Sequence, residues 1–203
     1  MYSSPHYVDE LARRPLTFGS CNNVSRLTPQ TLRLWAKVLV AVPQSRLLLR
    51  PPSLVDAGAK EVMVQRLSRL GVDPSRIEIR DPSGLRDMMD EHVDVDIALD
   101  PVTINGGIAS LQAMWMGVPV LCLLGDHFAS RLSASFMTAA GLPEWVAKDD
   151  EAYVAIARQM AADRLGLLAL KRDMRDRLRK TPAWDIKAHT RAFEQALLDM
   201  CRG

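Results

Sequence analysis

Short apolar runs alternate with longer segments of helical spacing along most of this 203-residue chain. The apolar runs are typical of strands, and between them apolar residues recur every three or four positions, as in helices that bury one face. We predict strands over residues 16–20, 46–50, 76–80, 95–99 and 118–124. The later part of the chain is almost entirely helical in pattern, with predicted helices over residues 129–140, 150–163, 167–180 and 186–200.

The order of these elements predicts an α/β fold: a doubly wound, Rossmann-like and mostly parallel sheet with C-terminal helices. The run 118–124 supports this, because a strand that is apolar at nearly every position suits a sheet covered on both faces. Residues 1–15 are polar and are interpreted as a leader or linker, which leaves one domain over residues 16–203. Such a fold hosts many activities, so the function has to be sought in the loops.

Local signals mark two helix ends and part of the core. Thr28 offers an N-cap with Pro29 at the first helical position. Gly71 is predicted to follow the end of the next helix. The four tryptophans lie in apolar helical contexts and are predicted to pack in the core: Trp35, Trp115, Trp145 and Trp184.

Composition removes several classes of function. The formal net charge is +2, which gives no overall field to attract nucleic acid or an anionic membrane. No apolar run approaches the roughly 20 residues that span a bilayer, and the first 15 residues lack the apolar core of a signal peptide. The cysteines Cys21, Cys122 and Cys201 are far apart, which argues against a disulfide framework or a zinc site and fits a reducing cytoplasm.

Two clusters of charged residues are interpreted as solvated. Basic residues from Lys171 to Lys180 alternate with carboxylates, which predicts a solvated helix face. Asp94 and Asp96 alternate around the start of a predicted strand. A metal site is one interpretation of these two carboxylates, and a solvated strand end is the preferred one.

Ligands of open parallel sheets bind beyond the carboxyl ends of the strands, so the loops that follow strands carry the candidate chemistry. One such loop contains Asn105, Gly106 and Gly107 and leads into a predicted helix. Glycines let a ligand approach the backbone closely, and the positive end of a helix dipole suits a phosphate. Many ordinary strand-to-helix turns also contain two glycines, so the pattern alone leaves both interpretations open.

Two further loops are candidates with a simpler alternative. The loop after the first strand contains Asn23 and Arg26, whose amide and guanidinium could bind a base, a sugar or a phosphate. In the loop after residue 124, Asp126 is predicted as a helix N-cap that Arg131 could pair with, and His127 has no evident partner. Helix capping alone accounts for both loops and is the favoured interpretation of their patterns.

Several segments match one known family in order and spacing: residues 17–23, 28–36, 42–43, 95–100, 105–107, 114–120, 125–126, 129–131 and 139–144. Together they resemble the C-terminal catalytic lobe of the O-GlcNAc transferase/SPINDLY family, glycosyltransferase family 41. The resemblance implies one lobe of a GT-B fold, with the active site in the cleft between two lobes. It also implies that the sugar is transferred with inversion and without a metal or other cofactor. The implied donor is UDP-GlcNAc or a related nucleotide-sugar, or GDP-fucose as in SPINDLY.

The resemblance assigns donor-binding roles by position. Asn23 corresponds to an amide near the donor phosphates, and Arg26 to a basic residue on the diphosphate. Asn105, Gly106 and Gly107 open the phosphate-binding helix. A further segment, whose backbone meets the uracil in the family, comprises Arg80, Asp81, Pro82 and Ser83. No catalytic residue is assigned, because the proposed base belongs to the N-terminal lobe.

Several positions depart from the family pattern. Two threonines that contact the diphosphate are Ile108 and Ala109 here, and an acidic residue that contacts the ribose is Gln112. A histidine and a lysine of the family correspond to Met88 and Leu85. Losing several charge-assisted contacts, at roughly 1.5–3 kcal/mol each, would weaken donor binding considerably.

Three functions therefore stay open. The first is a donor-binding lobe that needs an N-terminal lobe for activity, and the second is a degenerate lobe that binds only a nucleotide or a protein partner. The third, another nucleotide-sugar enzyme such as an epimerase, has no specific support. The expected partners are a nucleotide-sugar and a separate N-terminal lobe or tetratricopeptide-repeat protein. Self-association through an exposed apolar surface is a further expectation, and neither a nucleic acid nor a membrane is expected as a partner.

Overall fold

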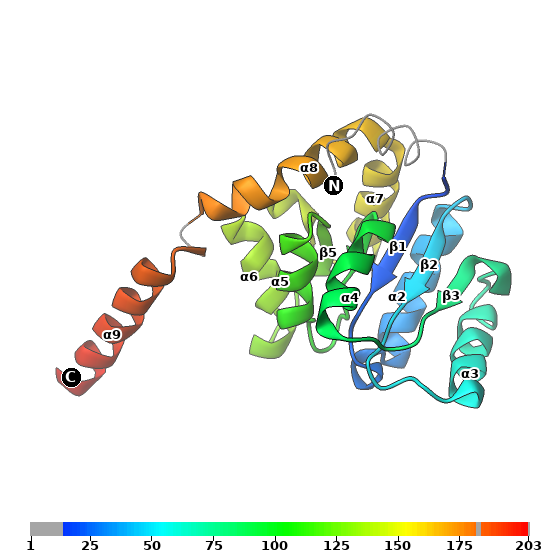
Figure 1. The fold of residues 1–203 in the computed structure, drawn as a ribbon, viewed down its shortest axis with the longest axis horizontal. Coiled ribbons are helices and arrows are strands. Elements are labelled where there is room, and N and C mark those ends of the chain that lie inside the picture. Colours follow the sequence, from blue (N-terminus) through cyan, green and yellow to red (C-terminus); the bar gives the residue numbers. More distant parts are fainter. Residues whose placement is uncertain (1–13, 182–183, 203) are drawn as a thin grey trace.

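The computed structural model describes residues 14–181 and 184–202. Six parallel strands form the sheet in the order β3-β2-β1-β4-β5-β6 (Figure 1). Their bounds are β1 (Thr17–Ser20), β2 (Arg46–Leu49), β3 (Ile77–Ile79), β4 (Ile97–Leu99), β5 (Val120–Leu123) and β6 (Val146–Ala147). Residues 1–13, most of the predicted leader, lie outside the described residues.

Helices cover both faces of the sheet, with α2 and α7 packed together on one face and α5 on the other (Figure 1). The α-helices are α2 (Pro29–Ala41), α3 (Ala57–Ser68), α4 (Leu85–Asp90), α5 (Ile108–Trp115), α6 (Leu132–Ala139), α7 (Asp150–Ala162), α8 (Arg164–Arg179) and α9 (Ile186–Arg202). Short 3-10 turns are η1 (Val24–Arg26), η2 (Pro74–Arg76), η3 (Glu91–Asp94), η4 (Phe128–Ser130) and η5 (Pro143–Trp145). The predicted doubly wound parallel fold is confirmed.

The structure differs from the predicted elements in three places. Strand β6 was not predicted, because two residues are too few to show an alternating pattern. Helix α8 begins at Arg164, earlier than predicted, because the Asp163 carboxylate accepts a 2.8 Å hydrogen bond from the backbone N–H of Gly166 and caps the first turn. The helix predicted over residues 129–140 is divided into η4 and α6.

The predicted local signals are confirmed. The Thr28 hydroxyl accepts a 3.3 Å hydrogen bond from the backbone N–H of Thr31 and caps α2. Gly71 follows the end of α3 with φ of 92°, a conformation that favours glycine. Trp35 and Trp145 are fully buried, and Trp115 is half-buried, with Arg175 and Arg179 of α8 stacked over its ring.

The interpretation of Asp96 and Lys171 as solvated is wrong. Asp96 is buried, and its Oδ2 accepts a 2.8 Å hydrogen bond from the backbone N–H of Thr17. Lys171 of α8 is also buried and lies 3.5 Å from Asp96 Oδ1. Its ammonium group donates to the carbonyl oxygen of Val95. A buried carboxylate needs a nearby cation, so this pair fixes α8 to the amino end of β4.

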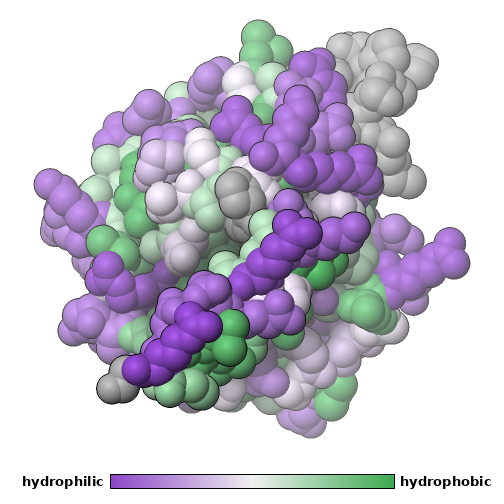
Figure 2. All heavy atoms as spheres, turned by 90° about the vertical axis from the view of Figure 1, so that its left-hand side faces the viewer, coloured by the Kyte–Doolittle hydropathy of each residue, from purple (hydrophilic) through white to green (hydrophobic). Residues whose placement is uncertain are grey.

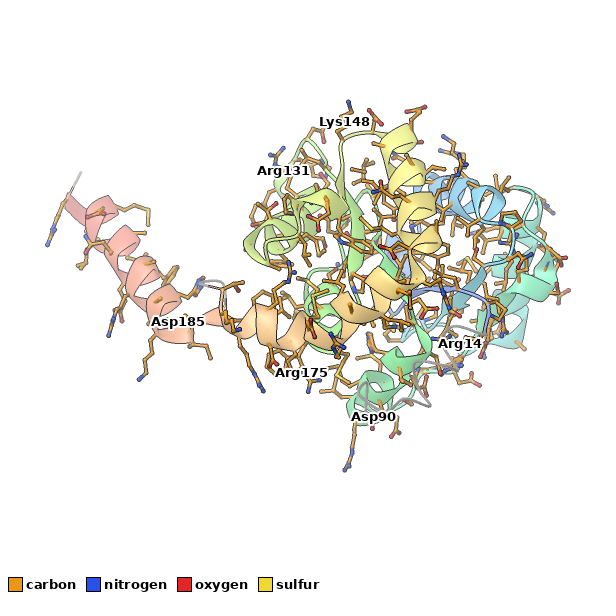
Figure 3. All side chains as sticks on the ribbon, turned by 90° about the horizontal axis from the view of Figure 1, so that it is seen from above. Arg14, Asp90, Arg131, Lys148, Arg175 and Asp185 are labelled. Carbon is orange, nitrogen blue, oxygen red and sulfur yellow. The ribbon has the colours of Figure 1, made fainter. Side chains whose placement is uncertain are left out.

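Further contacts tie the start of the described chain to the same carboxylate. Arg14 Nη2 donates a 3.0 Å hydrogen bond to Asp96 Oδ1. Burial lowers the pKa of Lys171 to about 8, while the charge of Asp96 opposes that shift. Seen from above, Arg14 lies at the edge of the main body, near one end of α8 (Figure 3).

Helix α9 projects from the body of the molecule (Figure 1), and all of its residues are exposed. Asp185 marks the place where the chain leaves α8 towards it (Figure 3). The exposed apolar side chains of α9 include Ile186, Phe193 and Met200. The face of the molecule on this side mixes hydrophobic with hydrophilic side chains (Figure 2). In the described part of the chain, no helix combines the length and the apolar character needed to cross a membrane.

Candidate functional site

The order of the strands identifies where a ligand would bind. The chain builds outward from β1 through β2 to β3, then returns to the other side of β1 and continues from β4 through β5 to β6. The connections therefore leave β1 and β4 in opposite directions, and the loops that follow these two neighbouring strands open a crevice at the carboxyl edge. These are the loops over residues 21–26 and 100–107, two of the three that the sequence singled out.

A direct contact joins the two loops. Arg26, the last residue of η1, donates a hydrogen bond from Nη1 to the carbonyl oxygen of Asn105. The nearby backbone of Gly107 has φ of 60° and ψ of −111°, a conformation that requires glycine in practice. The structure thus brings Arg26, Asn105, Gly106 and Gly107 together, as the sequence predicted.

The N-terminus of α5 is open at this point. Gly107 is its N-cap residue and has no side chain, so no side chain caps the first turn of α5. The first N–H groups of a helix lack partners within the helix and carry the positive end of its dipole. An oxygen atom of a phosphate group can fill that place, with the guanidinium of Arg26 beside it.

Gly106 is enclosed by polar side chains. Its backbone N–H donates a 2.9 Å hydrogen bond to Asp100 Oδ1, which also accepts a 2.7 Å bond from the Ser110 hydroxyl. A Cβ atom added to Gly106 would contact the Ser110 hydroxyl and would lie 2.8 Å from Asp100 Oδ1 and 2.9 Å from Asn22 Oδ1. Glycine is therefore required here for packing rather than for backbone conformation.

The two predicted amides hold the loops in place. Asn105 is buried and donates a 3.0 Å hydrogen bond from Nδ2 to the carbonyl oxygen of Pro101. Its Oδ1 accepts a 3.1 Å bond from the backbone N–H of Ser133 in α6. Asn23 is exposed and caps η1, because its Oδ1 accepts a 3.1 Å bond from the backbone N–H of Ser25. The capping interpretation of Asn23 is confirmed.

The third loop is arranged differently from the prediction. Arg131 does not pair with Asp126, because its Nη1 donates a 2.9 Å hydrogen bond to the carbonyl oxygen of Gly125. The N-cap of η4 is His127 rather than Asp126. The exposed carboxylate of Asp126 instead lies 2.8 Å from His127 Nδ1, and this hydrogen bond lowers the pKa of Asp126. A bond from the backbone N–H of Asn105 to the carbonyl of Ala129, 2.9 Å long, joins this loop to the site.

The segment assigned to the base lies after β3, two strands away from β1. The side chain of Arg80 pairs with Asp94 at 2.6 Å and with Glu78 at 2.7 Å. The Asp81 carboxylate pairs with Lys60, and Ser83 is exposed, with its hydroxyl donating a 3.1 Å hydrogen bond to the carbonyl oxygen of Gly84. The charged side chains of Arg80 and Asp81 are paired within the protein, so contacts of this segment with a base would come from its backbone and from the exposed Ser83.

Of the positions that depart from the family pattern, Ile108, Ala109 and Gln112 lie on the first two turns of α5, whereas Leu85 and Met88 lie on α4. Ile108 is exposed, with 74% of its surface accessible, and it presents an apolar side chain where a hydroxyl could have bonded a phosphate. Ala109 and Gln112 are half-buried on the same helix. Within the described residues, no group of three or more histidine, cysteine, aspartate or glutamate residues could hold a metal ion.

Sequence reasoning missed the polar side chains beneath the loops. Asn22, Asp100, Ser110 and Ser133 are buried together there, and the Ser133 hydroxyl donates a 3.0 Å hydrogen bond to that of Ser110. Burial raises the pKa of Asp100 to about 6, and the bonds from Ser110 and Gly106 oppose that rise. The available signal was the position of Asp100 directly after a buried strand.

Comparison with known proteins decides the family. The family described as Glycosyl transferase family 41 matches residues 6–193. This chain belongs to glycosyltransferase family 41. The rice protein "Probable UDP-N-acetylglucosamine--peptide N-acetylglucosaminyltransferase SPINDLY" is 34% identical over 188 residues, which are 92% of this chain and 20% of the relative. A Caenorhabditis elegans UDP-N-acetylglucosamine--peptide N-acetylglucosaminyltransferase is 29% identical over 91% of this chain and 16% of the relative.

Solved structures agree with the assignment to family 41. A mutant O-GlcNAc transferase from Thermobaculum terrenum superimposes with a TM-score of 0.87 at 35% identity, over 92% of this chain and 36% of that one. Sucrose-phosphate synthase from Thermosynechococcus elongatus matches with a TM-score of 0.64 at 17% identity, over 99% of this chain and 50% of that one, and this likeness concerns the fold alone. These neighbours are GT-B glycosyltransferases. The chain spans about a fifth of the length of the curated relatives that it matches.

Proposed function

We propose that this family 41 chain is the nucleotide-sugar-binding lobe of an O-GlcNAc transferase-like glycosyltransferase, and that the loops after β1 and β4 hold the donor diphosphate. The observation that supports this most directly is the contact between Arg26 and the Asn105 carbonyl, beside the uncapped N-terminus of α5. It combines a guanidinium with free helix N–H groups, which are the usual donors to a phosphate.

In this proposal the lobe stabilises the leaving group. Transfer of the sugar leaves a nucleoside diphosphate, whose negative charge grows as the glycosidic bond breaks. Arg26 and the N–H groups at Gly107 and Ile108 are already oriented before the reaction, and such preorganised donors lower the barrier electrostatically. This scheme assigns the positive charge to Arg26 and the backbone and does not include a metal ion.

A second lobe is part of the proposal, because this chain spans only 20% of its rice relative. Exposed apolar side chains lie along the carboxyl edge and on α9, and they give such a lobe a surface to cover: Ile104, Ile108, Leu124, Phe128, Ile186 and Phe193. We propose that this lobe, or a tetratricopeptide-repeat protein that carries it, supplies the base and the acceptor. Self-association of the isolated chain would use the same apolar surface.

Calorimetric titration with UDP, GDP and UDP-GlcNAc tests the proposal. We expect one nucleotide to bind, and Arg26→Ala to weaken that binding by about tenfold or more, because one charge-assisted hydrogen bond contributes roughly 1.5–3 kcal/mol. Arg33→Ala, at an exposed position of α2, is the matched control and should bind as the parent does. No binding up to millimolar concentrations of all three ligands would rule out the donor-lobe proposal.

The substituted helix turn gives a second prediction. Ile108→Thr should tighten binding of the same nucleotide by roughly tenfold or more, because a hydrogen bond from a hydroxyl to a charged group contributes about 1.5–3 kcal/mol. Ile104→Thr is the control, since Ile104 is also exposed on this loop but precedes the helix. Equal affinity changes in both variants would mean that the hydroxyl at position 108 has no specific contact with the ligand.

The alternative is a non-catalytic, degenerate lobe that binds a nucleotide or a protein partner only. The apolar side chains of Ile108 and Ala109, in place of the family's hydroxyls, favour it. The titration separates the donor lobe from a degenerate lobe that binds only a protein, because the latter would bind none of the nucleotides.

A further inference from the structure

Asp100 lies directly beneath the loop that would hold the diphosphate. Its side chain is buried, with 1% of the residue's surface accessible. Oδ1 accepts two hydrogen bonds, from the backbone N–H of Gly106 at 2.9 Å and from the Ser110 hydroxyl at 2.7 Å. Oδ2 accepts no hydrogen bond from the described residues. One oxygen atom therefore fixes the loop, while the other is buried without a formed hydrogen bond, although the nearby Ser133 hydroxyl also favours the ionised carboxyl.

Arg26 is the cation whose charge favours the ionised form of the Asp100 carboxyl. Cys122 of β5 and Tyr153 of α7 also face it, and burial and the charge of Asp100 raise the pKa of both groups, so both stay neutral at neutral pH. Asp100 also lines a small cavity, together with two other titratable groups, Cys21 and His92. Burial raises the pKa of Cys21 to about 11 and lowers that of His92.

We propose that Asp100 is a positioning residue for the diphosphate and that it takes up a proton when the diphosphate binds. The inference rests on the proposed function of the loop. A diphosphate at the N-terminus of α5 would place negative charge on the opposite side of the Gly106 peptide from Asp100. It would also pair with Arg26 and thereby weaken the attraction between Arg26 and the Asp100 carboxylate.

Both effects disfavour the ionised carboxyl and act on a group whose pKa burial has already raised to about 6. The proton comes from the buffer and binds to Oδ2, which has no hydrogen bond to lose. Oδ1 continues to accept from Gly106 and Ser110, so the loop keeps its position when the charge is removed. The site then binds the diphosphate without an adjacent negative charge.

The sign of the pH dependence follows by linkage. A group whose pKa is higher in the complex than in the free protein makes affinity greatest at low pH. Affinity for the diphosphate falls as the pH rises from the pKa of Asp100 in the free protein to its pKa in the complex. Above that second pKa the affinity is constant. A shift of about one unit corresponds to a tenfold loss of affinity across this window.

The test is calorimetric titration with UDP-GlcNAc in pairs of buffers that differ in ionisation enthalpy, at several pH values from about 5.5 to about 8. This ligand is suitable because its diphosphate is esterified at both ends and does not titrate in that range. We expect uptake of a fraction of a proton per bound ligand, greatest near or just above pH 6. In Asp100→Asn, which keeps the shape and removes the charge, uptake should disappear. In His92→Gln, the matched control, uptake should remain.

Ser110→Ala supplies a second variant in case Asp100→Asn fails to fold. Removing the Ser110 hydroxyl takes away one bond to the carboxylate, so the window of proton uptake should move to higher pH. Binding of UDP-GlcNAc without proton uptake, or with equal uptake in Asp100→Asn, would overturn the inference and leave the proposed function intact. No binding at all by the parent chain would overturn the proposed function, and this inference with it.

Discussion

Replacing Gly106 with alanine is expected to weaken binding of UDP by tenfold or more and to lower the free energy of unfolding by about 1–3 kcal/mol. The added Cβ would press against the Ser110 hydroxyl and lie within 2.8 Å of Asp100 Oδ1 and 2.9 Å of Asn22 Oδ1. All three groups belong to the buried layer beneath the loop, so the loop must move outward. That movement displaces the N–H groups that would bind the phosphate.

Gly84→Ala is the matched control for this substitution. A Cβ added to Gly84 would lie 3.9 Å from Asp87 Oδ2, which is an ordinary contact, and the residue is exposed. Urea unfolding and calorimetric titration with UDP measure the two effects. If Gly106→Ala bound UDP as tightly as Gly84→Ala, the loop after β4 would not be the phosphate site.

Replacing Asp96 with alanine is expected to lower the free energy of unfolding by about 3–5 kcal/mol. The substitution leaves the ammonium of Lys171 buried without its carboxylate, and it removes the acceptor for the backbone N–H of Thr17. The effect should exceed that of any surface ion pair, because exposed pairs contribute at most about 1 kcal/mol. Urea unfolding of the parent and the variant gives the comparison.

Two further variants show whether the buried charge is the cause. Asp94→Ala removes a carboxylate that is 46% exposed and pairs with Arg80, and it should cost less than about 1 kcal/mol. The double variant Asp96→Ala, Lys171→Met should recover part of the loss, because it removes the unpaired cation. A double variant less stable than Asp96→Ala alone would show that the cost comes from lost packing rather than from charge.

The sequence predicted the fold because the signals for this fold are local. Apolar runs, helical spacing and the caps at Thr28 and Gly71 each depend on neighbouring residues, and together they determine a doubly wound sheet. Strand β6 could not be predicted from local signals, since its two residues are placed by pairing with β5. The burial of Asp96 and Lys171 could not be predicted locally either, because the two residues are 75 positions apart and only their contact shows that neither faces solvent.

The site was predicted in parts. The two loops could be recognised separately by their glycines, amides and basic residue, and the resemblance to family 41 placed them in one site. Their actual contact, from Arg26 to the Asn105 carbonyl, depends on the neighbouring positions of β1 and β4. Asp100 escaped notice because a single carboxylate after a strand has no distinguishing pattern, and its role follows only from its burial beneath Gly106.

The central claim is that the N-terminus of α5 and Arg26 bind the diphosphate of a nucleotide. The most direct test is an amide NMR titration of the ¹⁵N-labelled chain with UDP. We predict that the largest shifts occur at the backbone N–H groups of Gly106, Gly107 and Ile108, together with a shift of the Arg26 side-chain signals. Shifts confined to other parts of the chain, or no shifts at millimolar UDP, would contradict the account.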